Sequence, residues 1–137
     1  MMNDELHRRA ALGEPQACLH LAKRLFRGRG ESRNYEQAVQ YLDTAARAGS
    51  ADALYQLAKC YLKGIGCVKD AVGGVSCLEQ AAALGHATAA LKLGECFEKG
   101  NGAPASSELA AYWYRKAAAL GAEDAASQAL SRLAQHM

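Results

Sequence analysis

The sequence predicts an all-α protein, a right-handed α-solenoid in which antiparallel helix pairs stack into a curved row of about eight helices. The first observation is a 36-residue period, shown by Gly28, Gly64 and Gly100. A fixed period of roughly 20 to 50 residues is typical of stacked repeat proteins. The second observation is composition, because alanine, a strong helix former, is abundant while only 7% of residues are aromatic. The third is that no run of alternating β-branched residues predicts a strand.

Residues 1–137 are interpreted as one domain that begins with a half-repeat, residues 1–13. This segment resembles the second helix of a pair, because Ala10 keeps the period with alanines of the later repeats. Asn3 or Asp4 is the expected N-cap, since short polar side chains accept hydrogen bonds from the first free N–H groups of a helix. Gly13 would end the helix and starts a second glycine series with the same period, continued by Gly49, Gly85 and Gly121.

Three full repeats follow, over residues 14–49, 50–85 and 86–121. The first helix of each pair ends before a Gly-x-Gly loop and the second starts after a polar capping residue. Residues 122–137 match only a first helix, so they are expected to form a C-terminal capping helix. The predicted first helices are 15–27, 51–63 and 87–99, and the predicted second helices are 34–48, 70–84 and 106–120.

Small and large apolar residues recur at fixed positions and predict how the helices pack. An i, i+4, i+8 stripe on each first helix places three such side chains on one face. Small residues let helices approach closely while the larger ones fill the space between them. The stripe positions are Ala17, Ala53, Ala89 and Ala125, then Leu21, Leu57 and Leu93, then Leu25, Tyr61, Phe97 and Leu133.

One repeat departs from this pattern at Gly73 and Gly74, where Ala38 and Ala110 occupy the position of Gly74. A glycine inside a helix costs about 1 kcal/mol relative to alanine. The favoured explanation is that the second helix of this repeat starts late. A local hinge in the middle of the solenoid is the alternative.

Charge and cysteine usage exclude several classes of function. The net charge of +2 does not indicate nucleic-acid binding, and no apolar run is long enough for membrane insertion. The five cysteines form no CxxC pair and have no histidine at zinc-finger spacing, so no zinc site is expected. No secretory signal is visible at the start, and an odd number of cysteines fits reduced thiols better than a disulfide framework. The expected location is cytoplasmic.

The repeated motif resembles the Sel1-like repeat, a relative of the tetratricopeptide repeat. Its pattern is a first helix with alanine, leucine and an aromatic residue, a G-x-G loop, and a second helix ending in W/Y-x-x-A-A-x-x-G. The matching segments are 53–70, 89–102 and 112–121, with Gly28-Arg29-Gly30 and 41–49 in the first repeat. The resemblance implies a protein-binding scaffold with no catalytic residue and no cofactor. Some secreted members carry a disulfide in each repeat, a cysteine pairing that is absent here.

The polar side of the first helices is the candidate binding site. At 100° per residue, one stripe lies opposite the packed stripe, and by the same resemblance it would line the concave groove of the solenoid. Its excess of cations predicts a protein or peptide partner that is acidic or bears a carboxylate. A plain solvated helix face is the competing interpretation. The candidate residues are His20, Lys23, Arg27, Asp52, Gln56, Lys59, Lys63, Lys92, Glu95 and Lys99.

The sequence leaves three alternatives to a groove-binding scaffold open. Cys67, in the loop after Gly66, is the cysteine expected to be exposed, so an enzyme or small-ligand binder could use it or a groove pocket. An immunity or regulatory protein that inhibits one dedicated enzyme would also be a protein binder. A homo-oligomer is a further option, because three repeats leave short end faces. The glycine pairs do not predict phosphate binding, since each one follows a helix rather than a strand.

Overall fold

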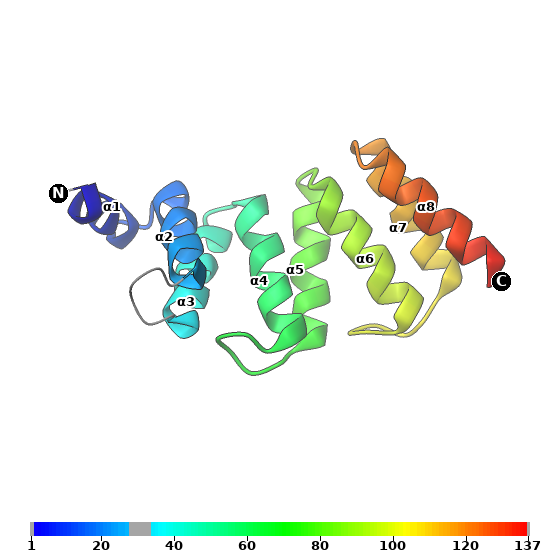
Figure 1. The fold of residues 1–137 in the computed structure, drawn as a ribbon, viewed down its shortest axis with the longest axis horizontal. Coiled ribbons are helices and arrows are strands. Elements are labelled where there is room, and N and C mark those ends of the chain that lie inside the picture. Colours follow the sequence, from blue (N-terminus) through cyan, green and yellow to red (C-terminus); the bar gives the residue numbers. More distant parts are fainter. Residues whose placement is uncertain (1, 28–33, 137) are drawn as a thin grey trace.

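The computed structural model describes residues 2–27 and 34–136, which contain eight α-helices and no strand. The helices stand side by side in one row, so the two ends of the chain lie at opposite ends of the molecule (Figure 1). This confirms the predicted all-α solenoid. The helices are α1 (Met2–Ala11), α2 (Pro15–Arg27), α3 (Tyr35–Arg47), α4 (Ala51–Lys63), α5 (Ala71–Ala83), α6 (Ala87–Lys99), α7 (Ser107–Ala119) and α8 (Glu123–Gln135).

Helix contacts are almost entirely between neighbours along the chain. The closest packing joins α2 to α3, α4 to α5 and α6 to α7, and each pair packs on the next. Among the described residues, α6 also touches α8 beyond its immediate neighbour. This nearest-neighbour pattern is that of a solenoid, in which stability is close to a sum over repeats and their interfaces.

The helix starts follow from capping residues at the repeat period. Asn34, Asp70 and Ser106 each accept a hydrogen bond from the backbone N–H three residues later. Ser50 and His86 do the same for α4 and α6. Each cap satisfies an N–H group that has no partner inside its helix, so the local sequence fixes where these helices begin.

The glycines of the Gly-x-Gly loops have two separate roles. Gly64 ends α4 with φ 72°, and its N–H donates to the Cys60 carbonyl. Gly66 lies against the previous repeat, because an added Cβ would come within 2.3 Å of the Tyr35 carbonyl oxygen. Gly102 has the same relation to Ala71. The second glycine therefore allows one repeat to pack on the one before it, and the predicted role of helix termination was only half of the explanation. Gly28 and Gly30 lie outside the described residues.

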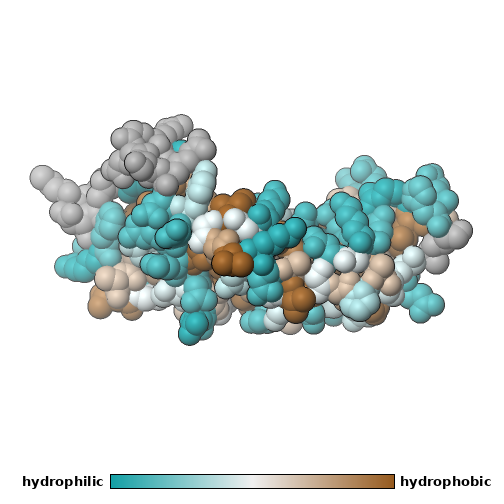
Figure 2. Space-filling view, turned by 90° about the horizontal axis from the view of Figure 1, so that it is seen from below, coloured by the Kyte–Doolittle hydropathy of each residue, from teal (hydrophilic) through white to brown (hydrophobic). Residues whose placement is uncertain are grey.

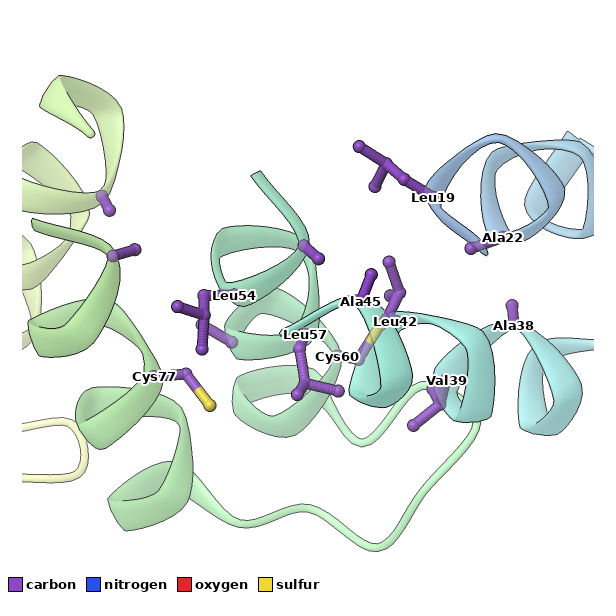
Figure 3. Close-up of a cluster of buried hydrophobic side chains, with 14 of the residues drawn as sticks. Leu19, Ala22, Ala38, Val39, Leu42, Ala45, Leu54, Leu57, Cys60 and Cys77 are labelled. Carbon is purple, nitrogen blue, oxygen red and sulfur yellow. The ribbon is translucent and has the colours of Figure 1, made fainter. Parts of the chain in front are cut away.

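The largest core cluster consists mainly of alanine, leucine and cysteine side chains from α1 to α6, part of which is shown in Figure 3, and two smaller clusters lie among α5, α6, α7 and α8. Ala17, Ala53 and Ala89 are buried as predicted. Ala125 is exposed, so its place in the packed stripe was predicted wrongly. The equivalent alanines are covered by neighbouring helices, whereas no described helix follows α8 to cover Ala125.

The explanation favoured for Gly73 and Gly74 is wrong, because α5 starts at Ala71 and has the same length as the other second helices. Both glycines lie in its first turns. A Cβ at Gly74 would be 2.9 Å from Leu62 Cγ, and one at Gly73 would be 2.5 Å from a carboxylate oxygen of Asp70. Close helix packing therefore accounts for Gly74, whereas the Asp70 cap does not require a glycine at 73, because Gln37 and Leu109 occupy the same position after the caps Asn34 and Ser106.

The expected N-cap of the first helix was also wrong. Helix α1 begins at Met2, so Asn3 and Asp4 lie inside its first turn. Sequence patterns locate helix ends only to within one or two residues.

Candidate partner-binding groove

The polar residues of α2, α4 and α6 lie on one side of the solenoid because the other sides of these helices are buried. In α4, the buried residues include Ala53, Leu57 and Cys60, together with Leu54 and Leu62. The ten residues of the predicted stripe are all exposed or half-buried, as are neighbours such as Arg24 and Tyr55. We call this surface the first-helix face. Seen from the edge of the molecule, hydrophilic side chains cover much of the surface, with smaller apolar patches between them (Figure 2).

The largest concentration of predicted site residues surrounds a hollow of about 420 Å³ between α2 and α4, here called the α2/α4 pocket. Four cations line it, two from each helix, and its described lining residues include no aspartate or glutamate. None of the four forms an ion pair with a carboxylate of residues 2–27 or 34–136. The lining residues are Lys23, Phe26, Arg27, Tyr35, Gln56, Lys59, Cys60, Lys63 and Ile65.

Two further hollows continue the first-helix face on either side. One of about 430 Å³ lies toward α1 and is lined in part by His20, Lys23 and Arg27. One of about 130 Å³ lies between α4 and α6 and is lined in part by Lys59, Lys63 and Lys92. Because Lys23, Arg27, Lys59 and Lys63 each line two hollows, the cations form a continuous row from α2 to α4.

The acidic members of the stripe are already engaged. Asp52 Oδ1 lies 3.0 Å from His86 Nε2. His86 Nδ1 accepts the Ala89 N–H, so the ring proton is on Nε2 and donates to Asp52. In the third repeat, Glu95 pairs with Lys92 at 3.3 Å. The basic character of the stripe is therefore concentrated in the first two repeats, which its residue types alone did not predict.

Tyr55 holds one of the cations in place. Lys59 Nζ lies 5.2 Å from the centroid of the Tyr55 ring, a cation–π contact. The same ring stacks on His86 with centroids 4.9 Å apart, so it is itself fixed. An ammonium restrained in this way loses less conformational entropy when it binds an anion.

Cys67 does not have the surroundings of a nucleophile. It is half-buried, and its thiol donates to the carbonyls of Cys60 and Ile65, each at 3.6 Å. Burial, and then the nearby Asp70 carboxylate, raise the pKa of Cys67, whereas a reactive cysteine needs a lowered pKa. Cys60 is buried and its pKa is raised to about 11, mainly by burial.

The described part of the chain contains neither a candidate metal site nor a candidate membrane-spanning helix. No group of three histidine, cysteine, aspartate or glutamate side chains there could hold a metal ion. The search of the same residues found no helix with the length and hydropathy needed to cross a bilayer.

Sequence reasoning missed the apolar residues of the α2/α4 pocket. Phe26 and Tyr35 come from the end of α2 and the start of α3, with ring centroids 5.7 Å apart, and Ile65 is the middle residue of a Gly-x-Gly loop. The sequence did offer one indication. An isoleucine between two turn glycines lies outside the helices, so its apolar side chain has to pack elsewhere.

The fold is similar to several solved structures, of which three are described here. A Sel1 repeat protein from Oxalobacter formigenes is 35% identical with a TM-score of 0.80, and the alignment covers 93% of this chain and 96% of that one. A protective antigen of uropathogenic Escherichia coli with an SLR fold is 31% identical with a TM-score of 0.86, over 92% of this chain but only 27% of that one. Cysteine rich protein B of Helicobacter pylori is 25% identical with a TM-score of 0.69, covering 90% and 89%.

A comparison with curated protein sequences gave no significant match. A family model for the Sel1 repeat matches three consecutive segments, residues 15–50, 51–86 and 87–121. These segments cover most of the sequence and coincide with the three helix pairs of the solenoid. The chain belongs to the Sel1 repeat family.

Proposed function

We propose that this protein is a non-catalytic interaction scaffold that binds an acidic or carboxylate-bearing segment of a partner protein on the first-helix face. Sel1-repeat solenoids are commonly protein-interaction scaffolds, and the choice of face and partner charge is specific to this proposal. The observation that carries it is the row of Lys23, Arg27, Lys59 and Lys63, which has no counter-charge among the described lining residues. Such a row attracts and orients an anionic partner.

Charge reversal on the first-helix face tests this proposal. We expect the double variant Lys59→Glu, Lys63→Glu to bind a fluorescein-labelled oligoglutamate peptide at least about tenfold more weakly than the wild type, because each reversal replaces attraction by repulsion. The measurement is fluorescence anisotropy at two salt concentrations. The wild-type affinity should fall as salt rises.

The chain offers a matched control on the opposite set of helices. Arg115 and Lys116 are exposed cations of α7, so Arg115→Glu with Lys116→Glu changes the net charge by the same amount away from the first-helix face. This control should keep near wild-type affinity. An equal loss in both double variants would mean that binding follows net charge, and the proposed face would be wrong.

The cysteines support a cytoplasmic setting as part of the proposal. All five are free thiols and four are buried, so the packing of the described helices does not depend on a disulfide. A reducing compartment would leave this core unchanged.

A further inference from the structure

The lining of the α2/α4 pocket includes an apolar part, here called its floor, beside the cations that line it. Phe26, Tyr35 and Ile65 supply the rings and the branched side chain, and Cys60 completes the lining. The raised pKa of Cys60 keeps its thiol neutral at physiological pH. An apolar floor with a few polar groups around it is the usual form of a binding pocket.

The cations come from both helices that border this pocket. Lys23 and Arg27 come from α2, while Lys59 and Lys63 come from α4, each pair one helical turn apart. The rim therefore favours negative charge on either side of whatever enters the pocket. Its volume of about 420 Å³ is near the lower end of ligand pockets, which suits one bulky side chain and its flanking backbone.

The next junction of the same solenoid serves as an internal comparison. At the positions one period later, Ala71 replaces Tyr35, Asn101 replaces Ile65 and Glu95 replaces Lys59. The hollow between α4 and α6 is correspondingly smaller, about 130 Å³. Within the described residues, the combination of aromatic floor and four cations thus belongs to the first junction rather than to the repeat in general.

We infer that the α2/α4 pocket anchors an acidic partner segment through one aromatic or large aliphatic side chain that has carboxylates on both sides. The apolar side chain enters the floor, and the flanking carboxylates meet Lys23 and Arg27 on one side and Lys59 and Lys63 on the other. This inference rests on the proposed function and specifies the partner's chemistry at one place on the groove.

Two labelled peptides separate the contribution of the floor from that of the rim. One has glutamates flanking a central phenylalanine, and the other has the same glutamates around alanine. We expect the wild type to bind the phenylalanine peptide about tenfold more tightly, since burial of the apolar ring is favourable and outweighs the cost of ordering it. Fluorescence anisotropy gives both dissociation constants.

The floor variant carries Tyr35→Ala and Ile65→Asn, the residues that the next repeat uses at the same positions. It should lose the preference for phenylalanine while keeping the wild-type affinity for the alanine peptide. Tyr112→Ala removes an aromatic ring that is 48% exposed on α7 and should keep the preference. Far-UV circular dichroism and urea unfolding show whether each variant is folded. The further control Ile65→Leu keeps an apolar floor and should retain the preference for phenylalanine.

The outcomes distinguish this inference from the proposed function. If both peptides bind the wild type equally and Lys59→Glu with Lys63→Glu weakens both, the groove stands and the anchor pocket is wrong. If neither peptide binds, both proposals fail. Competition by inorganic phosphate at equal concentration would indicate a small-anion site, and dimerisation at the measured concentrations that blocks both peptides would indicate a second copy as the occupant. Either result overturns the inference.

Discussion

Gly94 and Tyr114 face each other between α6 and α7, and their sizes differ from those of the equivalent residues in the earlier repeats. The equivalent pairs are Ala22 with Leu42 and Ala58 with Leu78, all four fully buried. In the third repeat, glycine replaces the alanine and tyrosine replaces the leucine. Tyr114 is also fully buried. A Cβ at Gly94 would lie 2.5 Å from Tyr114 Cε1, so the tyrosine fits only because position 94 has no side chain.

Gly94→Ala should therefore destabilise the protein although alanine favours helix. We expect a loss of about 1–2 kcal/mol in the free energy of unfolding, because overpacking costs about 1–3 kcal/mol and the helix preference returns up to about 1 kcal/mol. Combining it with Tyr114→Leu, which recreates the pair of the other repeats, should cost less than the sum of the single changes. Urea unfolding of the wild type, both single variants and the double variant measures these costs. Additive costs would show that the sizes of residues 94 and 114 are not coupled.

At the scale of elements, the last helix is attached by a polar network in addition to its apolar packing. Glu98 stands where the earlier repeats have Phe26 and Leu62. Its carboxylate accepts a hydrogen bond from the Tyr114 hydroxyl at 2.5 Å and from the Arg132 guanidinium at 2.9 Å. Helices α6, α7 and α8 thus meet at one carboxylate that is 19% exposed.

This network makes the free energy of unfolding depend on pH in the acidic range. The hydrogen bond from Arg132, opposed by desolvation and assisted by the bond from Tyr114, lowers the pKa of Glu98. A carboxyl group whose pKa is lower in the folded state stabilises the fold above its unfolded pKa, and this contribution is lost as pH falls through the folded pKa. The decline should begin below about pH 5, since free glutamate has a pKa of about 4.3.

Glu98→Gln tests this pH dependence. The variant should lose up to about 1 kcal/mol at pH 7, a modest figure because Arg132 is half exposed, and the deficit should shrink toward pH 3. Glu79→Gln, an exposed acid on α5, is the control and should follow the wild type at every pH. Urea unfolding between pH 3 and pH 7 provides the comparison. A deficit that stays constant with pH would show that Glu98 acts through shape rather than charge.

The sequence predicted the helices well because their ends are encoded locally. Caps such as Asp70 and terminating glycines such as Gly64 lie within a turn of the boundary that they set. What the period could not predict depends on distances between helices, such as Gly74 against Leu62. The floor of the α2/α4 pocket is of the same kind, since it brings together residues from three segments. The cations were predictable as a stripe, but their concentration in two repeats depends on pairs such as Lys92 with Glu95.

For the whole molecule, charge and end packing differ between the two ends. Residues 1–69 contain 11 lysines and arginines against 7 acids, while residues 70–137 contain 5 against 7. The half that holds the α2/α4 pocket is therefore the more basic one, and under the proposed function its field would direct an acidic partner there. The other half supplies the more firmly packed terminal helix, with Ala126, Ala129 and Leu133 buried in α8.

Removing the terminal helices should separate stability from binding. A chain ending at Gly121 loses three buried side chains and the Arg132 ion pair, and we expect it to be about 3–4 kcal/mol less stable by urea unfolding. A chain starting at Glu14 loses only Ala10 among the buried side chains described in α1, so the cost should be about 1–2 kcal/mol. In a solenoid such losses stay local, because each repeat contacts only its neighbours. The chain without α8 should therefore keep wild-type affinity for the phenylalanine peptide at temperatures where it remains folded. A parallel loss of affinity would place the bound segment along the whole groove, with α8 as part of the site.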